Sequence, residues 1–259
     1  MILAIDIGNT TVALCGLKDG RVCFETHLNS RTQWTAPACR KAMEEAFLAC
    51  KLGPAPRFEG AVLTSVVPAL TPVFSACAEA FTPAPALVAG PALVTGLIMD
   101  VRYPEKVGVD RIVDAAAAAR YYPLPVITVD MGTCTTFNVV DEKGVFRGGA
   151  IAPGLSTGLR TLHEKTAQLP LVRPAAPKTA IGKDTESCIL SGAVYGAAAL
   201  IDGMAARFEE ELGCPATLVV TGGHSRWVAP LCRHPLTRDE NLMMKGLALL
   251  WELNRGKKA

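Results

Sequence analysis

The sequence has no uncharged apolar run near the ~20 residues that a helix needs to span a bilayer. Asp6 interrupts the first apolar segment too early for a secretory signal peptide. The formal net charge is only +2, which gives no sign of a basic surface for nucleic acid or for an anionic membrane. We therefore expect a cytoplasmic protein that binds neither a membrane nor nucleic acid.

No pair among the nine cysteines forms a CxxC motif or shows the spacing of zinc ligands, and their odd number fits no closed set of disulfides. Cys39, Met43, Phe47 and Cys50 recur at helical spacing. We expect the thiols to lie mostly in the core, where a free cysteine behaves as a small apolar side chain. Such thiols indicate a reducing compartment.

Charged residues are also scarce, at 19% of the chain, whereas hydrophobic residues make up 50%. This composition argues against disorder and supplies an ample core. The 259 residues are enough for one large domain or for two of ordinary size.

An internal repeat favours two domains. Residues 3–11 read LAIDIGNTT, and residues 127–136 read ITVDMGTCTT. Each apolar run ends at an aspartate followed by glycine and hydroxyl side chains, and each continues into apolar runs joined by a turn that contains glycine, which is typical of β-hairpins. Asp6 and Asp130 should therefore each lie where one strand bends into the next, beside a glycine that lets a ligand approach the backbone. Two such turns facing each other would form a phosphate-binding cleft.

The order of the expected elements repeats as well. We expect strands at 2–6, 12–17, 22–27, 60–67 and 86–89 with helices at 36–51 and 70–80, then strands at 125–130, 136–140, 144–151 and 216–221 with helices at 155–168 and 186–212 and two more near the C-terminus. Glycine and proline punctuate residues 90–108, and a helix begins near Asp110. We place the domain boundary on this helix, giving domains 1–117 and 118–259 with a cleft between them.

The usual phosphate-binding loops are missing. The chain has no GxxxxGK[ST] and no GxGxxG after its first strand. It offers instead DIGNT at 6–10, DMGTCTT at 130–136, GGAIAPG at 148–154 and TGG at 221–223. Phosphoryl transfer needs backbone N–H groups and hydroxyls around the phosphates, carboxylates for cations and a base near the accepting hydroxyl. These motifs supply each of those groups.

Taken in order, the motifs resemble the nucleotide-binding signature of the acetate and sugar kinase, Hsp70 and actin superfamily. With Tyr103-Pro104 and Gly108-Val-Asp-Arg111 added, the set DxGNT, GxDR, DxGTxxT and GGxIxPG resembles the type III pantothenate kinases. The resemblance implies an α/β fold of two ribonuclease H-like domains, an actin-like ATPase duplication with a cleft between the halves. It also implies ATP-dependent phosphorylation of (R)-pantothenate to (R)-4'-phosphopantothenate, the first step of coenzyme A biosynthesis.

The resemblance assigns ATP to the first turn and to one residue of the second copy. The expected ATP-binding residues are Asp6, Ile7, Gly8, Asn9, Thr10, Thr11, Val12, Ala13 and Thr133. Asp6 would also contact Mg²⁺, through water because magnesium keeps part of its hydration shell. Without the second copy, the same residues would fit equally well an ordinary hairpin turn that contains asparagine and glycine.

Asp110 is the expected catalytic residue. By resemblance it is the base that accepts the proton of the pantothenate hydroxyl, while its position also fits an N-cap of the helix that follows. Arg111 would meet an anion, since a guanidinium binds planar oxyanions in a fork, although a surface ion pair is the alternative. Tyr103, Gly108 and Val109 would line the pantothenate pocket with them.

Thr185 would complete the pocket, in a homodimer in which it can serve the neighbouring active site. Its alternative role is helix N-capping. Asp130 would bind a monovalent cation, K⁺ or NH₄⁺, although direct Mg²⁺ ligation stays open from sequence alone. The glycine segments 148–154 and 221–223 would form backbone loops for phosphate and adenine. His224 follows the second of these, and we expect it at the surface.

Two rival functions remain. One is a kinase of the same superfamily acting on a different small hydroxyl acceptor, such as a sugar; the short chain, without large insertions, argues against it. The other is a non-catalytic ATP-binding regulator, since relatives of the family have been described as accessory transcription factors. Intact Asp6, Asp110, Arg111 and Asp130 argue against that function.

Overall fold

The computed structural model describes residues 1–18, 20–53, 55–90 and 93–255. Its contacts form two compact units, the first made of Met1–Gly96, Tyr103–Ala117 and the chain from Asn241 onward, the second of Leu97–Arg102 and Ala118–Glu240. The chain passes between the units at 96/97, 102/103, 117/118 and 240/241, whereas the sequence suggested a single boundary at 117/118. We expected the segment from Asn241 to belong to the second domain, but it packs with the first unit. Asp19, in the turn that joins the second and third expected strands, and Pro54, which follows the expected helix at 36–51, lie outside the described residues.

The first unit contains one mixed sheet in the order β3-β2-β1-β4-β5. Its strands are β1 (Ile2–Ile7), β2 (Thr11–Lys18), β3 (Arg21–Asn29), β4 (Ala61–Ser65) and β5 (Leu87–Val88). The first three strands form an antiparallel meander, and β4 and β5 continue the sheet parallel to β1.

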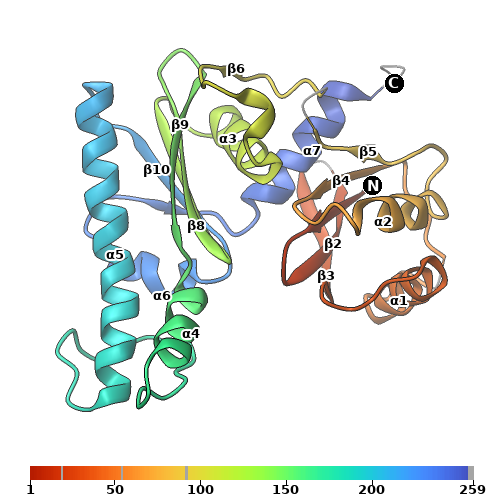
Figure 1. The fold of residues 1–259 in the computed structure, drawn as a ribbon. Helices are drawn as coiled ribbons and strands as arrows, with labels where there is room; N and C mark the ends of the chain where they lie inside the picture. The colour runs from red at the N-terminus through yellow and green to blue at the C-terminus, as the bar shows by residue number, and fades with distance from the viewer. Residues whose placement is uncertain (19, 54, 91–92, 256–259) are drawn as a thin grey trace. The chain divides into compact units, whose positions relative to one another are not determined.

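Helices pack against both faces of this sheet. Alternate residues of β1 point to opposite faces, so Leu3 and Ile5 join the core beneath α1 (Ala36–Ala49) and α2 (Thr71–Glu79). Ala4 belongs to the core of the other face, with residues of α3 (Val109–Tyr121) and α7 (Leu242–Asn254). Figure 1 shows α1 and α2 beside the red and orange strands.

The second unit repeats the plan. Its sheet has the order β11-β10-β7-β8-β9-β6. The strands are β6 (Ile98–Met99), β7 (Val126–Met131), β8 (Cys134–Val140), β9 (Val145–Pro153), β10 (Thr217–Thr221) and β11 (Thr237–Arg238). Strands β9, β8, β7, β10 and β11 have the order and directions of β3, β2, β1, β4 and β5. The predicted α/β duplication is confirmed.

The helices of the second unit are α4 (Leu155–Lys165), α5 (Thr185–Leu212) and the short α6 (Ser225–Val228), which continues into the 3-10 turn η2 (Ala229–Leu231). Apolar residues of α4, α5 and α6 pack on β7, β8 and β10, and the long α5 runs beside the green strands in Figure 1. By length and composition α5 could also cross a membrane, but a core helix passes the same test, and one third of its most apolar window is buried.

Several sequence expectations needed correction. The irregular stretch 90–108 contains the two-residue strand β6 and the 3-10 turn η1 (Pro104–Lys106), neither of which was expected, and β11 was missed as well. All nine cysteines are free, and Cys15, Cys39 and Cys77 are buried as expected. The core assignment is wrong for Cys23, Cys134 and Cys188, which are exposed because they lie on solvent-facing strand and helix positions.

Candidate functional site

In the first unit, Asp6 is the penultimate residue of β1, which ends at Ile7 just before the turn Gly8–Thr10. It is the half-buried residue of a strand that is otherwise buried, and it pairs in register with Ala13 on β2 and Thr64 on β4. The turn is closed by Gly8 N–H, which donates to Thr11 O at 2.9 Å. The sequence prediction of an aspartate at a strand-to-strand bend is confirmed.

The side chains of this segment divide into two groups. Asn9, Thr10 and Thr11 are exposed and can offer side-chain groups to a ligand. Ile7, Val12 and Ala13 are buried in the core. Any contact of these three with a nucleotide would therefore use the backbone.

Asp110 stands in the first turn of α3, which begins at Val109. Its Oδ1 accepts a hydrogen bond from Arg111 N at 2.9 Å, and Oδ2 accepts none from the part of the chain that the structure describes. A Cβ added at Gly108 would lie 2.6 Å from that Oδ1. Glycine at 108 therefore leaves the room that the carboxylate occupies. Asp110 is not the residue before the helix, so the N-cap alternative does not describe it.

Arg111 is half-buried beside this carboxylate. Burial lowers the pKa of its guanidinium, and the negative charge of Asp110 opposes that effect. Tyr103, in contrast, is 53% exposed, and Lys106 Nζ lies 4.5 Å from the centre of its ring. Arg111 and Tyr103 belong to the same unit as Asp110.

Asp6 lies on β1 and Asp110 on α3, and apolar residues of these two elements pack in the same core. Ala4, two residues before Asp6 on β1, is in the core that contains Val113 of α3. Residues two apart on a strand face the same side, and residues three apart on a helix share a face. Both aspartates therefore extend from the side of the first sheet that α3 covers.

In the second unit, Asp130 has the position that Asp6 has in the first. It is the half-buried residue of β7 and pairs in register with Thr136 and Thr221. The turn that follows is closed by Gly132 N–H, which donates to Cys134 O at 2.9 Å. Thr133 is exposed at the tip of the turn, as a phosphate-binding hydroxyl requires.

Two of the predicted glycine loops close around this turn. Gly222 has φ +86°, and a Cβ there would overlap Asp130 Oδ1. A Cβ at Gly154 would overlap Thr133 O. These glycines allow a close approach of backbone to the turn. Glycine is needed at position 149 for a different reason, since a Cβ there would overlap Phe137 O on the neighbouring strand.

The structure adds two residues that the sequence analysis did not assign to the site. His224 is half-buried rather than at the surface, and its Nε2 lies 2.8 Å from Ser156 Oγ. His224 N donates to Met131 O at 3.2 Å. The pair is separated by 68 residues, so no local pattern in the sequence could reveal it.

Thr185 is exposed and is the first residue of α5. The N-cap is Asp184, whose Oδ1 accepts Ser187 N at 2.8 Å, and these hydrogen bonds lower the pKa of Asp184. The capping role therefore belongs to Asp184 rather than to Thr185. The Thr185 side chain accordingly has no capping function to compete with ligand binding.

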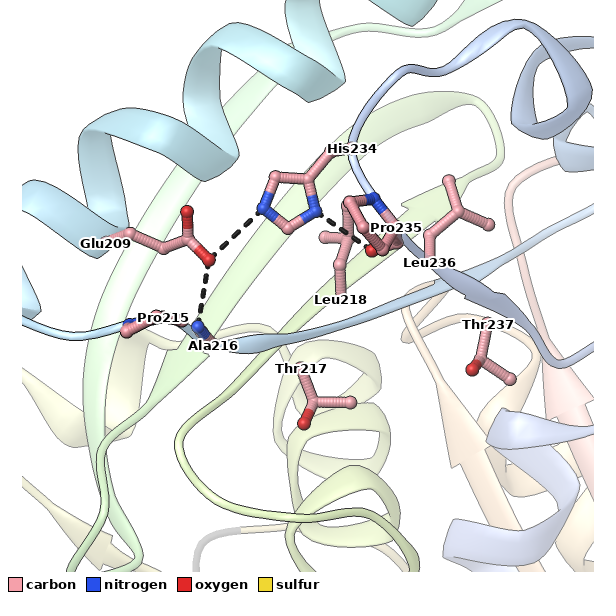
Figure 2. A pocket seen from close by; sticks show the side chains of 9 residues that line it. All are labelled: Glu209, Pro215, Ala216, Thr217, Leu218, His234, Pro235, Leu236 and Thr237. Carbon is pink, nitrogen blue, oxygen red and sulfur yellow. Dashed lines mark hydrogen bonds and ion pairs between the residues drawn. The ribbon is translucent and has the colours of Figure 1, made fainter.

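A cavity in the second unit lies elsewhere. It measures about 590 Å³ and is lined by Glu209, Pro215–Leu218 and His234–Thr237. Figure 2 shows Glu209 and His234 directed toward each other at its wall. The cavity adjoins Thr217 at the amino end of β10, whereas Asp130 pairs with Thr221 at the carboxyl end. It is therefore separate from the candidate site.

Within the described residues, no group of three or more His, Cys, Asp or Glu side chains is arranged to hold a metal ion. A cation at Asp6 or Asp130 would thus rely on one carboxylate with backbone, nucleotide or water oxygens. This donor set fits hydrated Mg²⁺ and monovalent cations, and it does not fit a transition metal.

Comparison with known proteins identifies the family. A family model described as type III pantothenate kinase matches residues 2–207. The type III pantothenate kinase of Anaeromyxobacter sp. (strain K) is 37% identical over 258 residues, which cover 98% of this chain and 100% of that protein. The type III pantothenate kinase of Brevibacillus brevis is 35% identical with the same coverage.

Solved structures support the fold. A Baf family transcriptional activator from Campylobacter jejuni matches with a TM-score of 0.61 at 18% identity, over 98% of this chain and all of that chain. The inorganic polyphosphate/ATP-glucomannokinase from Arthrobacter sp. strain KM matches with a TM-score of 0.50 at 16% identity, over 98% and 99% of the two chains. These likenesses confirm the predicted actin-like fold. By the full-length sequence matches, the chain belongs to the type III pantothenate kinase family.

Proposed function

We propose that the protein transfers the γ-phosphoryl group of ATP to the primary hydroxyl of (R)-pantothenate, giving (R)-4'-phosphopantothenate, the first step of coenzyme A biosynthesis. The observation that carries the proposal is the geometry at Asp110. Its carboxylate is fitted over Gly108 at the start of α3, with one oxygen held by Arg111 N. A full-length relationship to pantothenate kinases supports the choice of acceptor.

Asp110 is the general base of this proposal. Its Oδ2 would accept the proton of the pantothenate hydroxyl while the bond to phosphorus forms, and the fixed Oδ1 would hold the carboxylate in position. The acceptor alcohol is a weak nucleophile, so positioning and charge neutralisation should supply most of the rate. Arg111, half-buried, would bind the pantothenate carboxylate or the transferred phosphoryl group.

The nucleotide would be held by the two repeated turns. In the first, Gly8–Thr11 would supply backbone N–H groups and the exposed side chains, with Ile7, Val12 and Ala13 contributing backbone only. In the second, Thr133 would donate its hydroxyl to the phosphates. Mg²⁺ bound with ATP would neutralise phosphate charge, and Asp6 would hold it through water. Asp130 would hold a monovalent cation, K⁺ or NH₄⁺.

The acceptor would contact Tyr103, Gly108, Val109 and Arg111. Thr185 would join them in a homodimer, where it can serve the partner's pocket. We place the protein in the cytoplasm, where its nine free thiols would stay reduced.

A coupled assay of ADP formation tests the function. We expect turnover with ATP and pantothenate, stimulated by KCl relative to NaCl at equal ionic strength. Formation of phosphopantothenate should be checked by mass spectrometry of the product. Turnover with a sugar panel but not with pantothenate would establish the other kinase class. Nucleotide binding without turnover of any acceptor would favour the regulator.

A further inference from the structure

His224 connects two segments of the second unit that are remote in sequence. Its backbone N–H donates to Met131 O at 3.2 Å, at the end of β7. Its ring reaches α4, where Nε2 lies 2.8 Å from the Oγ of Ser156, the second residue of that helix. The residue thus links the end of β7 to the start of α4.

The start of α4 in turn holds the β7–β8 turn. Thr133 O accepts two hydrogen bonds from it, one from Thr157 Oγ1 at 2.8 Å and one from Gly154 N at 3.2 Å. The contacts form a closed path from Met131 through His224 and the first turn of α4 back to Thr133. The two-residue turn between β7 and β8 is therefore fixed on both sides.

Neither ring nitrogen of His224 is both exposed and unpaired, so neither can bind the nucleotide directly. Its Nδ1 is buried and accepts or donates no hydrogen bond among the described residues, while Nε2 is occupied by Ser156. Thr133, in contrast, is exposed. An effect of His224 on the nucleotide would therefore pass through the turn.

We infer that His224 is a positioning residue for ATP, which, through its hydrogen bond with Ser156, holds the β7–β8 turn so that the Thr133 hydroxyl meets the phosphates. The inference rests on the proposed role of Thr133 in ATP binding. A turn of two residues has few internal contacts, and a binding group must be held within about 0.5 Å of its productive position by such supporting contacts. The path through Ser156 supplies that support.

Five variants test the inference: His224→Ala, Ser156→Ala, the double variant that combines these two changes, His224→Gln and Thr133→Ala. The readouts are the KM for ATP, the KM for pantothenate, the Kd for MgADP by titration calorimetry, and the Tm. Thr161→Ala is the matched control, because its hydroxyl donates to Thr157 O one turn further along α4 and does not touch the ring. Ser156→Ala removes only a half-buried hydroxyl, so it keeps the test valid if His224→Ala fails to fold.

We expect His224→Ala and Ser156→Ala each to raise the KM for ATP and the Kd for MgADP by about 3- to 10-fold, the effect of losing one hydrogen bond. The KM for pantothenate should stay unchanged. The double variant should bind MgADP as tightly as His224→Ala alone, because both changes remove the same hydrogen bond between His224 and Ser156. His224→Gln should recover most of the affinity, since its amide can reach Ser156 Oγ. Thr133→Ala should weaken nucleotide binding at least as much as His224→Ala does.

Unchanged MgADP affinity in His224→Ala and Ser156→Ala would overturn the inference, as would unchanged affinity in Thr133→Ala. A fall in Tm with equal changes in both KM values would also overturn it, because that result describes a structural role only. MgADP binding is measured without pantothenate. If the wild-type protein binds MgADP with the expected variant pattern but does not phosphorylate pantothenate, the proposed function fails and the inference stands.

Discussion

Asp6 and Asp130 occupy the same position in two copies of one fold. Each is the fifth residue of a six-residue strand, and each is the single residue of that strand that is not buried. The strands pair in the same way with their neighbours, antiparallel on one side and parallel on the other. Each copy therefore places one partly exposed carboxylate near the carboxyl end of an interior strand of an apolar sheet.

The turns that follow the two aspartates differ in length. In register, Asp6 pairs with Ala13 while Asp130 pairs with Thr136, so the second turn is shorter by one residue. The first turn exposes Asn9 and Thr10, whereas the second exposes Thr133. This difference supports unequal roles for the copies in the proposed ATP site.

The catalytic proposal predicts a selective defect in Asp110→Asn. The amide keeps the shape of the side chain but cannot accept a proton, so kcat should fall by ~10²-fold or more, while the Kd for MgADP should change little. Steady-state kinetics and calorimetry measure the two quantities. Glu105→Gln is a suitable control, because Glu105 is an exposed carboxylate near the same helix. A kcat near that of the wild type would remove Asp110 from the role of base.

The space over Gly108 makes a second prediction. A Cβ at this position would lie 2.6 Å from Asp110 Oδ1 and 3.7 Å from its Cγ. Gly108→Ala should therefore displace the carboxylate and lower kcat by about tenfold, since small misplacements of a catalytic group are costly. The Tm should change little. Gly90→Ala is the control, because its Cβ would meet no atom within 4 Å. Equal kcat values in the two variants would show that the carboxylate tolerates displacement.

The dependence of the reaction rate on KCl tests whether Asp130 binds a monovalent cation. The wild-type rate should rise with KCl at constant ionic strength, and Asp130→Asn should lose this response together with about tenfold in kcat, equivalent to about 1.4 kcal/mol. Glu142→Gln, an exposed carboxylate of the same unit, should keep the response. If Asp130→Asn is still activated by KCl but needs more Mg²⁺, direct Mg²⁺ ligation is the better assignment.

Much of this architecture could be predicted because its signals are local. The apolar runs that end at Asp6 and Asp130 identify both sheets, and the glycines beside them identify the turns. The sequence gives no recognisable pattern for very short strands or for contacts between residues that are far apart along the chain. Strands β6 and β11 have two residues each, which is too few for a periodic pattern. The bond between Ser156 and His224 depends on how α4 and the β10–α6 turn pack.

The return of the C-terminal helix was hidden for the same reason. In the structure α7 packs into the first unit, where a Cβ at Gly246 would lie 2.5 Å from Val113 Cγ1. The sequence shows an apolar helix there but does not show which sheet it covers. A division of the chain by sequence order therefore assigned residues from Asn241 onward to the second half.

The final prediction concerns the ion pair at the cavity in Figure 2. His234 Nε2 lies 3.1 Å from Glu209 Oε1, and Nδ1 lies 2.9 Å from Pro235 O. Burial lowers the pKa of His234, but the hydrogen bonds with Pro235 and Glu209 and the charges of Glu209 and Asp202 outweigh it, so the net shift is upward. Protonated His234 therefore stabilises the folded state.

The sign of the pH dependence follows from that shift. A histidine with a pKa raised above its unfolded value near 6.5 contributes fully below that pH, and the contribution is lost as pH rises through the folded pKa. His234→Gln should therefore lower the free energy of unfolding most at about pH 5.5 and less at about pH 8, measured by urea denaturation. His163→Gln is the control, because His163 contacts the Leu169 carbonyl rather than a carboxylate. A deficit in His234→Gln that stays constant across this range would show that the ion pair adds no pH-dependent stability.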